Sequence, residues 1–305
     1  MSTAVIQIQQ FCKSYNGTPA VQDLSLEVHQ GEIFGMVGPN GAGKTTTVEC
    51  MEGLRKPSSG HVSVLGCDPR RDRLQLSHRI GAQLQQAALP DRIKVGEALA
   101  YFSGLYGHPM AWEELLEQMG LTEKADDNFA QLSGGQKQRL FIALALVNNP
   151  ELIFFDELTT GLDPQARHRM WDIVRGIREQ GKTVFLTTHF MEEAERLCDR
   201  VAIIDQGKLI ALDTPTELIR GLSDESKVSF TLSEPVDLAE LEQLSTVTRL
   251  DRQGDTFIVF GSGRRLVADV VIFLTDQEIP FLDLRSTQPT LEDVFLELTG
   301  HELRS

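Results

Sequence analysis

The sequence is poor in basic residues. Its 305 residues include 29 Lys and Arg against 44 Asp and Glu, which gives a formal net charge of −15. A protein that grips nucleic acid usually carries a basic excess or a basic patch, so nucleic acid is not an expected partner. The same deficit argues against binding to anionic lipid by charge alone.

Cysteines and long apolar runs are also scarce. The four cysteines lie far apart without a Cys-x-x-Cys pair, which predicts free thiols in a reducing cytoplasm and no zinc site. No apolar run approaches the ~18 residues that a membrane-spanning helix needs. The N-terminus lacks the charged and apolar regions of a signal peptide. We therefore expect a cytoplasmic chain that does not cross a membrane.

The sequence does contain the material for a large buried core. Apolar residues make up 41% and charged residues 24%, as in ordinary globular proteins. The acidic excess is uneven, because residues 221–305 hold 16 acidic and 7 basic side chains. This shift predicts a first domain over residues 1–220 and a C-terminal accessory domain over 221–305.

Hydrophobic periodicity in the first 220 residues indicates strands that alternate with helices, which is typical of α/β architecture. Expected strands cover residues 4–15, 24–37 with a turn at Gln30-Gly31, 61–65, 152–155 and 184–186, and a hairpin covers 201–212. Helical patterns cover residues 92–120, 133–147 and 164–180. Asp163 and Pro164 stand where a helix N-cap and first residue belong.

Residues 222–305 follow a different order. Strands are expected at 227–232, 247–251, 256–260 and 281–284, with a turn at Gln253-Gly254. Helices are expected at 238–244 and 266–275, followed by a last helix at 290–298. The order βαββαβ predicts a small α+β domain of the ferredoxin-like kind.

A glycine-rich loop follows the apolar stretch 33–37 and precedes a helical pattern. Its sequence from Gly38 to Thr45, GPNGAGKT, fits G-x-x-x-x-G-K-[ST]. Glycines let backbone N–H groups surround phosphate oxygens, the lysine reaches the β- and γ-phosphates, and the hydroxyl can bind Mg²⁺. A chance glycine-rich turn would not need this strand–loop–helix context. The expected nucleotide-binding residues here are Gly38, Asn40, Gly41, Gly43, Lys44, Thr45 and Thr46.

Two carboxylates end the buried strand 152–155. Asp156 is expected to hold Mg²⁺, and Glu157 is expected to polarise the attacking water as a general base. A pair of acids that merely ends a strand is common, so this assignment depends on the phosphate loop.

Between these two motifs lies LSGGQ, which places Ser133, Gly134, Gly135 and Gln136 at a helix start. Amides at a helix N-terminus form a second anion site. In this position LSGGQ resembles the signature of the ABC (ATP-binding cassette) ATPases. In that family, this second site closes over the ATP of a facing subunit, which implies a homodimer with ATP sandwiched between its subunits.

The resemblance implies roles for four further residues. Tyr15 matches the aromatic residue that stacks on adenine, and Gln85 matches a glutamine that touches Mg²⁺ and the lytic water. Asp163, in Gly161-Leu162-Asp163, matches the D-loop, and His189 matches the switch histidine at the γ-phosphate. The sequence departs from the family at Leu158, where proline is usual.

The resemblance covers about residues 5–220. It implies a P-loop ABC ATPase cassette with a mixed sheet core, an antiparallel β subdomain and a helical subdomain at about 86–135. It also implies an ATPase that uses ATP and Mg²⁺ on the inner face of the cell membrane and energises separate transmembrane permease subunits.

The closing PTLEDVFLELTG resembles ATPases of drug, antibiotic or polysaccharide exporters, so efflux of a drug, antibiotic, polysaccharide or lipid is expected. Membrane contact is expected only through the protein partner. The alternatives are a soluble ABC ATPase in translation or DNA repair, and a P-loop kinase or GTPase.

Overall fold

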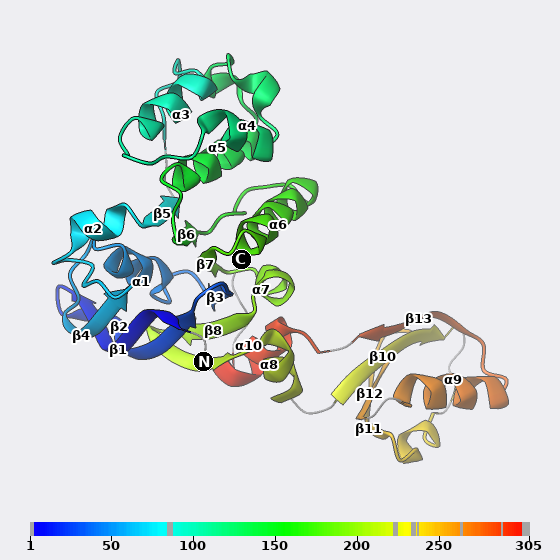
Figure 1. Ribbon diagram of the computed structural model, residues 1–305. Helices are drawn as coiled ribbons and strands as arrows, with labels where there is room; N and C mark the ends of the chain where they lie inside the picture. Colours follow the sequence, from blue (N-terminus) through cyan, green and yellow to red (C-terminus); the bar gives the residue numbers. More distant parts are fainter. Residues whose placement is uncertain are drawn as a thin grey trace. The chain divides into compact units, whose positions relative to one another are not determined.

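The chain divides into two compact units, which are described separately. The computed structural model describes residues 3–83, 88–221, 225–232, 236, 238–262, 265–287 and 289–300 (Figure 1). The first unit extends to Pro215, and the second begins at Thr216. Within the described residues, no helix is long and apolar enough to cross a membrane.

A six-stranded mixed sheet forms the centre of the first unit. All neighbouring strands in it are parallel except the final pair, β8 and β9, which is antiparallel. β3, β6 and β7 are buried along their whole length, which explains their continuous apolar sequences. The strand order is β5 (Ile80–Gln83), β6 (Leu152–Asp156), β7 (Thr183–Thr188), β3 (Ile33–Val37), β8 (Arg200–Asp205) and β9 (Lys208–Asp213).

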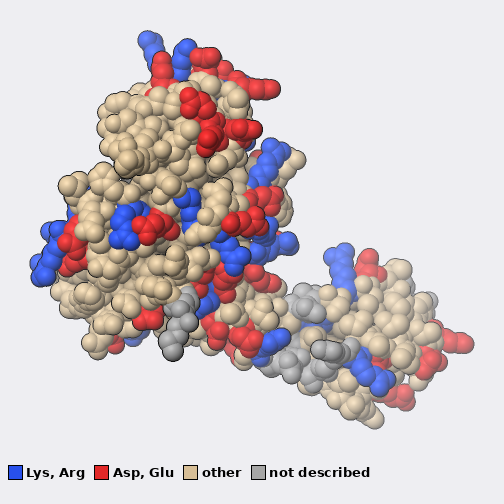
Figure 2. Space-filling view, in the orientation of Figure 1, with Lys and Arg blue, Asp and Glu red and all other residues tan. Residues whose placement is uncertain are grey.

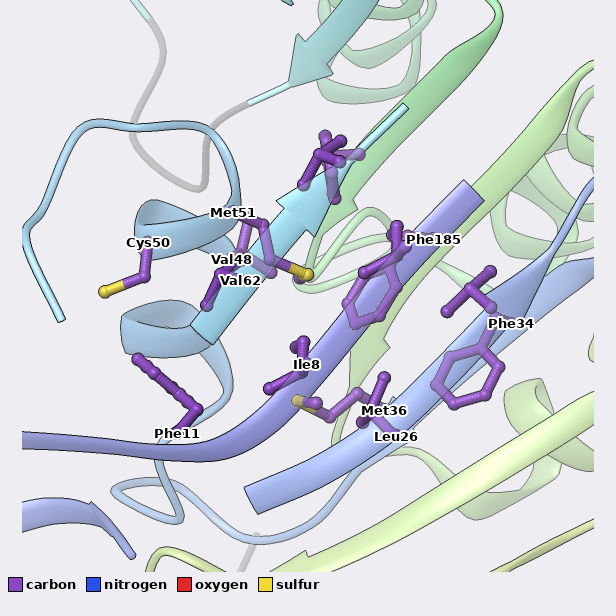
Figure 3. Packing of buried hydrophobic residues seen from close by; sticks show 14 of the residues in the cluster. Ile8, Phe11, Leu26, Phe34, Met36, Val48, Cys50, Met51, Val62 and Phe185 are labelled. Carbon is purple, nitrogen blue, oxygen red and sulfur yellow. The ribbon is translucent and has the colours of Figure 1, made fainter. Parts of the chain in front are cut away.

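A smaller antiparallel sheet packs with this one around a shared core. Its order is β2 (Thr18–His29), β1 (Ala4–Tyr15) and β4 (Ser59–Val64). The core also includes α1 (Lys44–Met51), which contributes Val48 and Met51 (Figure 3). Phe34 and Phe185 stack there with ring centroids 5.5 Å apart. This core fixes the start of α1 against the end of β3, where the glycine-rich loop lies.

Three helices gather into a separate layer of the first unit (Figure 1). They are α3 (Val95–Ser103), α4 (Trp112–Gln118) and α5 (Gly134–Leu146), with 3₁₀ turns η1 (Thr122–Lys124) and η2 (Phe129–Gln131) between α4 and α5. The mixed sheet, the antiparallel sheet and this helical layer confirm the architecture that the sequence predicts.

Four more helices follow or flank the strands of the first unit. In α6 (Pro164–Glu179), Asp163 is the N-cap and Pro164 the first residue, as predicted. The others are α2 (Arg73–Ser77), α7 (Met191–Leu197) and α8 (Pro215–Gly221), which spans the division between the units. Acidic and basic side chains are interspersed on the face drawn in Figure 2.

The second unit contains an antiparallel four-stranded sheet in the order β11 (Val247–Gln253), β12 (Thr256–Ser262), β10 (Glu225–Leu232) and β13 (Phe281–Thr287). α9 (Leu266–Asp276) contributes Val270 and Leu274 to a core with Phe230 of β10. α10 (Leu291–Thr299) follows Thr290, whose side chain caps it.

Two details of the second unit differ from the sequence prediction. The helix predicted at 238–244 is wrong: only a 3₁₀ turn, η3 (Leu241–Gln243), forms there. Leu238, Leu241 and Leu244 recur every three residues, which matches the three residues per turn of a 3₁₀ helix. The hairpin turn is Gly254-Asp255, one residue later than predicted, because Gln253 still pairs with Thr256.

Candidate nucleotide-binding and hydrolysis site

The glycine-rich loop connects the end of β3 to the start of α1. Gly41 and Gly43 have φ of 84° and 102°, values that side chains disfavour. A Cβ atom on Gly43 would also lie 2.6 Å from the carbonyl oxygen of Ala20. The loop borders a pocket of about 320 Å³ lined by Ala20, Asn40, Gly41, Gly43, Lys44, Thr45, Thr46 and Glu157.

Lys44 folds back over this loop. Its ammonium donates to the carbonyl oxygens of Gly38 at 2.8 Å and Pro39 at 3.1 Å, and the residue is only 4% exposed. Burial lowers the pKa of Lys44, while the charges of Glu157 and Asp156 oppose that shift. The backbone carbonyls hold the buried ammonium beside the pocket. A phosphate bound there could therefore form an ion pair with a cation that has already lost most of its water.

Asp156 ends β6 and is 3% exposed. The Thr187 hydroxyl donates to its Oδ1 atom, and the Thr45 side chain is also hydrogen-bonded to it. Burial raises the pKa of Asp156, and these two hydrogen bonds oppose the rise. A carboxylate beside a hydroxyl is a set of oxygen ligands that suits Mg²⁺, so Thr45 and Asp156 fit the metal role predicted for them.

Glu157 lies between Lys44 and His189. Its Oε1 atom is 3.6 Å from Lys44 Nζ and 3.5 Å from His189 Nδ1, and its side chain is 7% exposed. Thr160 Oγ1 donates to its other oxygen at 3.3 Å. The residue has a φ of +53°, which is uncommon for a side-chain-bearing residue and marks a backbone fixed by its surroundings.

Thr187 is a positioning residue that the sequence analysis missed. Its hydroxyl donates to Asp156, and the Glu157 amide donates to its hydroxyl at 3.2 Å and to its carbonyl at 3.1 Å. The signal was present, since β6 and β7 are parallel neighbours whose carboxyl ends meet. A hydroxyl at the end of β7, just before His189, could have been placed beside the two acids.

The signature residues form a second, separate pocket of about 280 Å³. Its lining includes Ser133, Gly134, Gly135 and Gln136 together with Asp163, and none of the phosphate-loop residues. Ser133 caps α5: its hydroxyl accepts from the Gln136 amide at 3.3 Å, and Gln136 Oε1 accepts from the Ser133 amide at 2.8 Å. The first-turn amides of α5 at Gly134 and Gly135 remain available to an anion.

Two predicted residues, Tyr15 and Asp163, do not line the pocket of the phosphate loop. Tyr15 is half-buried, with Lys13 Nζ 4.8 Å and the Arg55 guanidinium carbon 5.4 Å from its ring centroid, and it does not line the loop's pocket. The Asp163 carboxylate accepts from the Ala166 amide at 2.9 Å and so caps α6. Gln85 lies outside the described residues.

Comparisons with known proteins agree with this geometry. A model of the family described as "ABC transporter" matches residues 21–160. The chain is 36% identical over 310 residues to the linearmycin resistance ATP-binding protein LnrL of Bacillus subtilis (strain 168), covering 98% of this chain and 100% of that protein. It is 40% identical over 309 residues to the Nod factor export ATP-binding protein I of Burkholderia pseudomallei (strain K96243), covering 99% of both chains.

The fold is also similar to solved structures. One is the dimeric structure of an ATP-binding cassette in a post-hydrolysis state bound to ADP and Pi. The match has a TM-score of 0.61 and 27% sequence identity, and it covers 68% of this chain and 98% of that one. Together with the phosphate loop, the two acids and the signature helix, these similarities identify the protein's family. The chain belongs to the ABC transporter family, as an ATP-binding subunit that hydrolyses ATP.

Proposed function

We propose that two copies of this chain bind two ATP molecules head to tail and energise an exporter through separate membrane subunits. The observation that carries the proposal is the presence in one chain of two pockets, each at the start of a helix whose first amides suit an anion. One pocket contains the phosphate loop, and the other contains the signature helix. One ATP needs one γ-phosphate cradle, so the second cradle serves the ATP of a facing copy. The exposed Ser133 and Gly134 are free to meet it.

The chemical roles follow from the contacts. Glu157 takes the proton of the attacking water, and His189 and Thr160 orient its carboxylate from two sides. Lys44 stabilises the charge on the transferred phosphoryl group. Thr187 holds Asp156 and the Glu157 backbone in place. Mg²⁺, held by Thr45 and Asp156 with Gln85 proposed as a further contact, supplies charge neutralisation when bound.

The Asp156→Asn variant tests the metal role. An amide is a much poorer Mg²⁺ ligand than a carboxylate, so the Mg²⁺ concentration that half-saturates turnover should rise at least about tenfold. ATPase activity measured over a Mg²⁺ titration checks this. An unchanged Mg²⁺ requirement would remove Asp156 from the metal site.

The cargo class is proposed by likeness. The two relatives are named for resistance to linearmycin and for export of Nod factor, and both match nearly the whole chain. These names favour efflux of a drug, an antibiotic, or a polysaccharide or lipid. Choice among them belongs to the membrane subunits, which the chain would engage from the inner face of the membrane.

Binding to membranes tests the proposed coupling. Inverted vesicles from cells that express this chain's gene, stripped of peripheral proteins with urea, should bind the purified subunit saturably and raise its ATP turnover. Vesicles pretreated with protease should do neither. Absence of saturable, protease-sensitive binding would contradict a membrane-subunit partner.

A further inference from the structure

A groove of about 550 Å³ lies in the first unit where the helical layer meets β5 of the central sheet. Three aromatic side chains line it: Phe102 of α3, Phe141 of α5, and Tyr106, which follows α3. The half-exposed Leu54 adds an aliphatic side chain. Among the described residues that line it, Glu52 contributes the one carboxylate. The nucleotide chemistry described above uses none of these residues.

Glu52 is buried in this groove without compensation. It is 7% exposed, and neither carboxylate oxygen has a hydrogen-bond partner among the described residues. It is also the C-cap of α1, at the helix end where a negative charge is disfavoured. A buried carboxyl with no hydrogen-bond partner destabilises the free subunit. We therefore expect that a group outside this chain pairs with it.

The electrostatic surroundings of Glu52 do not supply a cation. Burial, with smaller contributions from the charges of Asp156 and Glu49, raises the pKa of Glu52 to about 8. Arg73 lines the same groove but is exposed and makes no ion pair with Glu52. Glu49, three residues earlier on α1, is paired with Arg55. Glu52 is therefore protonated at neutral pH until a cation arrives from outside the chain.

The lining selects the kind of cation. A guanidinium is weakly hydrated, stacks on aromatic rings and forms two parallel hydrogen bonds to a carboxylate, whereas an ammonium is strongly hydrated. Aromatic side chains around a single buried carboxyl therefore suit a guanidinium and not an ammonium.

We propose that Glu52 binds an arginine of the membrane subunit, and that this ion pair makes the groove selective for its partner. The proposal rests on the proposed function, because it assumes a membrane subunit. In the complex, both oxygens of Glu52 gain donors, and the guanidinium lies among Phe102, Tyr106 and Phe141. A partner that lacks the arginine forms no ion pair with Glu52 and therefore binds more weakly.

The urea-stripped vesicles described above test this assignment. The Glu52→Gln subunit should bind at least about tenfold more weakly than the wild type, because truncating one side of a buried charge pair acts strongly on dissociation. Glu49→Gln is the matched control: it changes a carboxylate on the same helix outside the groove, and it should bind as the wild type does. Phenylglyoxal, which modifies arginine, should weaken vesicle binding more for the wild type than for Glu52→Gln.

Thermal unfolding shows that Glu52→Gln is folded and reports on the buried carboxyl. Because folding raises the pKa of Glu52, protonation of this side chain favours the folded state. Its contribution to the free energy of unfolding is fully present below the ordinary pKa of 4.5 and is lost as the pH rises through about 8. The Gln variant lacks this loss. It should therefore melt a few degrees above the wild type at pH 9 and at the same temperature near pH 4.

The outcomes separate the two proposals. If wild type and Glu52→Gln bind the vesicles equally well, the role of Glu52 is overturned while the proposed function stands. Equal sensitivity of both proteins to phenylglyoxal overturns the arginine. If the wild type itself does not bind, the membrane-subunit function fails first.

Discussion

ATP turnover by the Glu157→Gln subunit should fall at least about 100-fold, which is the lower range of what a general base contributes. Glutamine keeps the shape of the side chain but cannot accept the proton of the attacking water. The variant should still bind ATP, because the phosphate loop and Asp156 are unchanged. Removing the charge that lies 3.6 Å from Lys44 also leaves that ammonium freer to meet phosphate.

The same variant should accumulate as an ATP-bound dimer, because hydrolysis is the step that resets the pair. Size-exclusion chromatography with ATP and steady-state ATPase assays measure the two effects. Glu151→Gln is the matched control: Glu151 precedes the same strand, pairs with Arg79 at the surface and should leave turnover near that of the wild type. Normal hydrolysis by Glu157→Gln would remove Glu157 from the base role.

The Ser133→Asp subunit should lose turnover by about 100-fold or more while it still binds ATP as a monomer. Aspartate caps helices as well as serine does, so α5 should keep its N-terminus and the fold should persist. The new carboxylate would, however, face the phosphates of the partner's ATP and repel them, where a donor is needed.

Nucleotide titration of the monomer separates this effect from misfolding. ATP affinity should match the wild type, because the phosphate-loop pocket contains no signature residue. ATP-driven dimerisation should disappear. A Ser133→Asp subunit with wild-type turnover would show that the signature helix does not face a phosphate.

How far the sequence predicts the structure depends on how local the determining contacts are. The glycine-rich loop before a helix and the helix starts at Ser133 and at Asp163-Pro164 are each contained in a few consecutive residues, and the structure has all three helices starting there. Asp156 and Glu157 lie beside the loop as predicted, since parallel strands end at one edge of the sheet.

Other features depend on contacts between distant segments. Thr187 meets Asp156 only through the pairing of β6 with β7, and Glu52 comes to line one groove with Phe102 and Phe141 only in the folded chain. The leucines at 238–244 recur every three residues, and a 3₁₀ turn forms there. The sequence predicted an α-helix because a period of three residues is hard to distinguish from one of 3.6 over only seven residues. The chemical roles of the site residues, those of Tyr15, Gln85 and Asp163 included, stay predictions.

We propose that each ATP is hydrolysed between the phosphate loop of one copy and the signature helix of another. Mixing two inactive variants, Lys44→Ala and Ser133→Asp, tests it most directly. Each homodimer has two defective sites, whereas the mixed dimer pairs the intact loop of one copy with the intact signature of the other. An equal mixture should recover up to about half of wild-type ATP turnover, because the mixed dimer has one working site of two and the Ser133→Asp homodimer does not form. A mixture as inactive as its components would contradict the account.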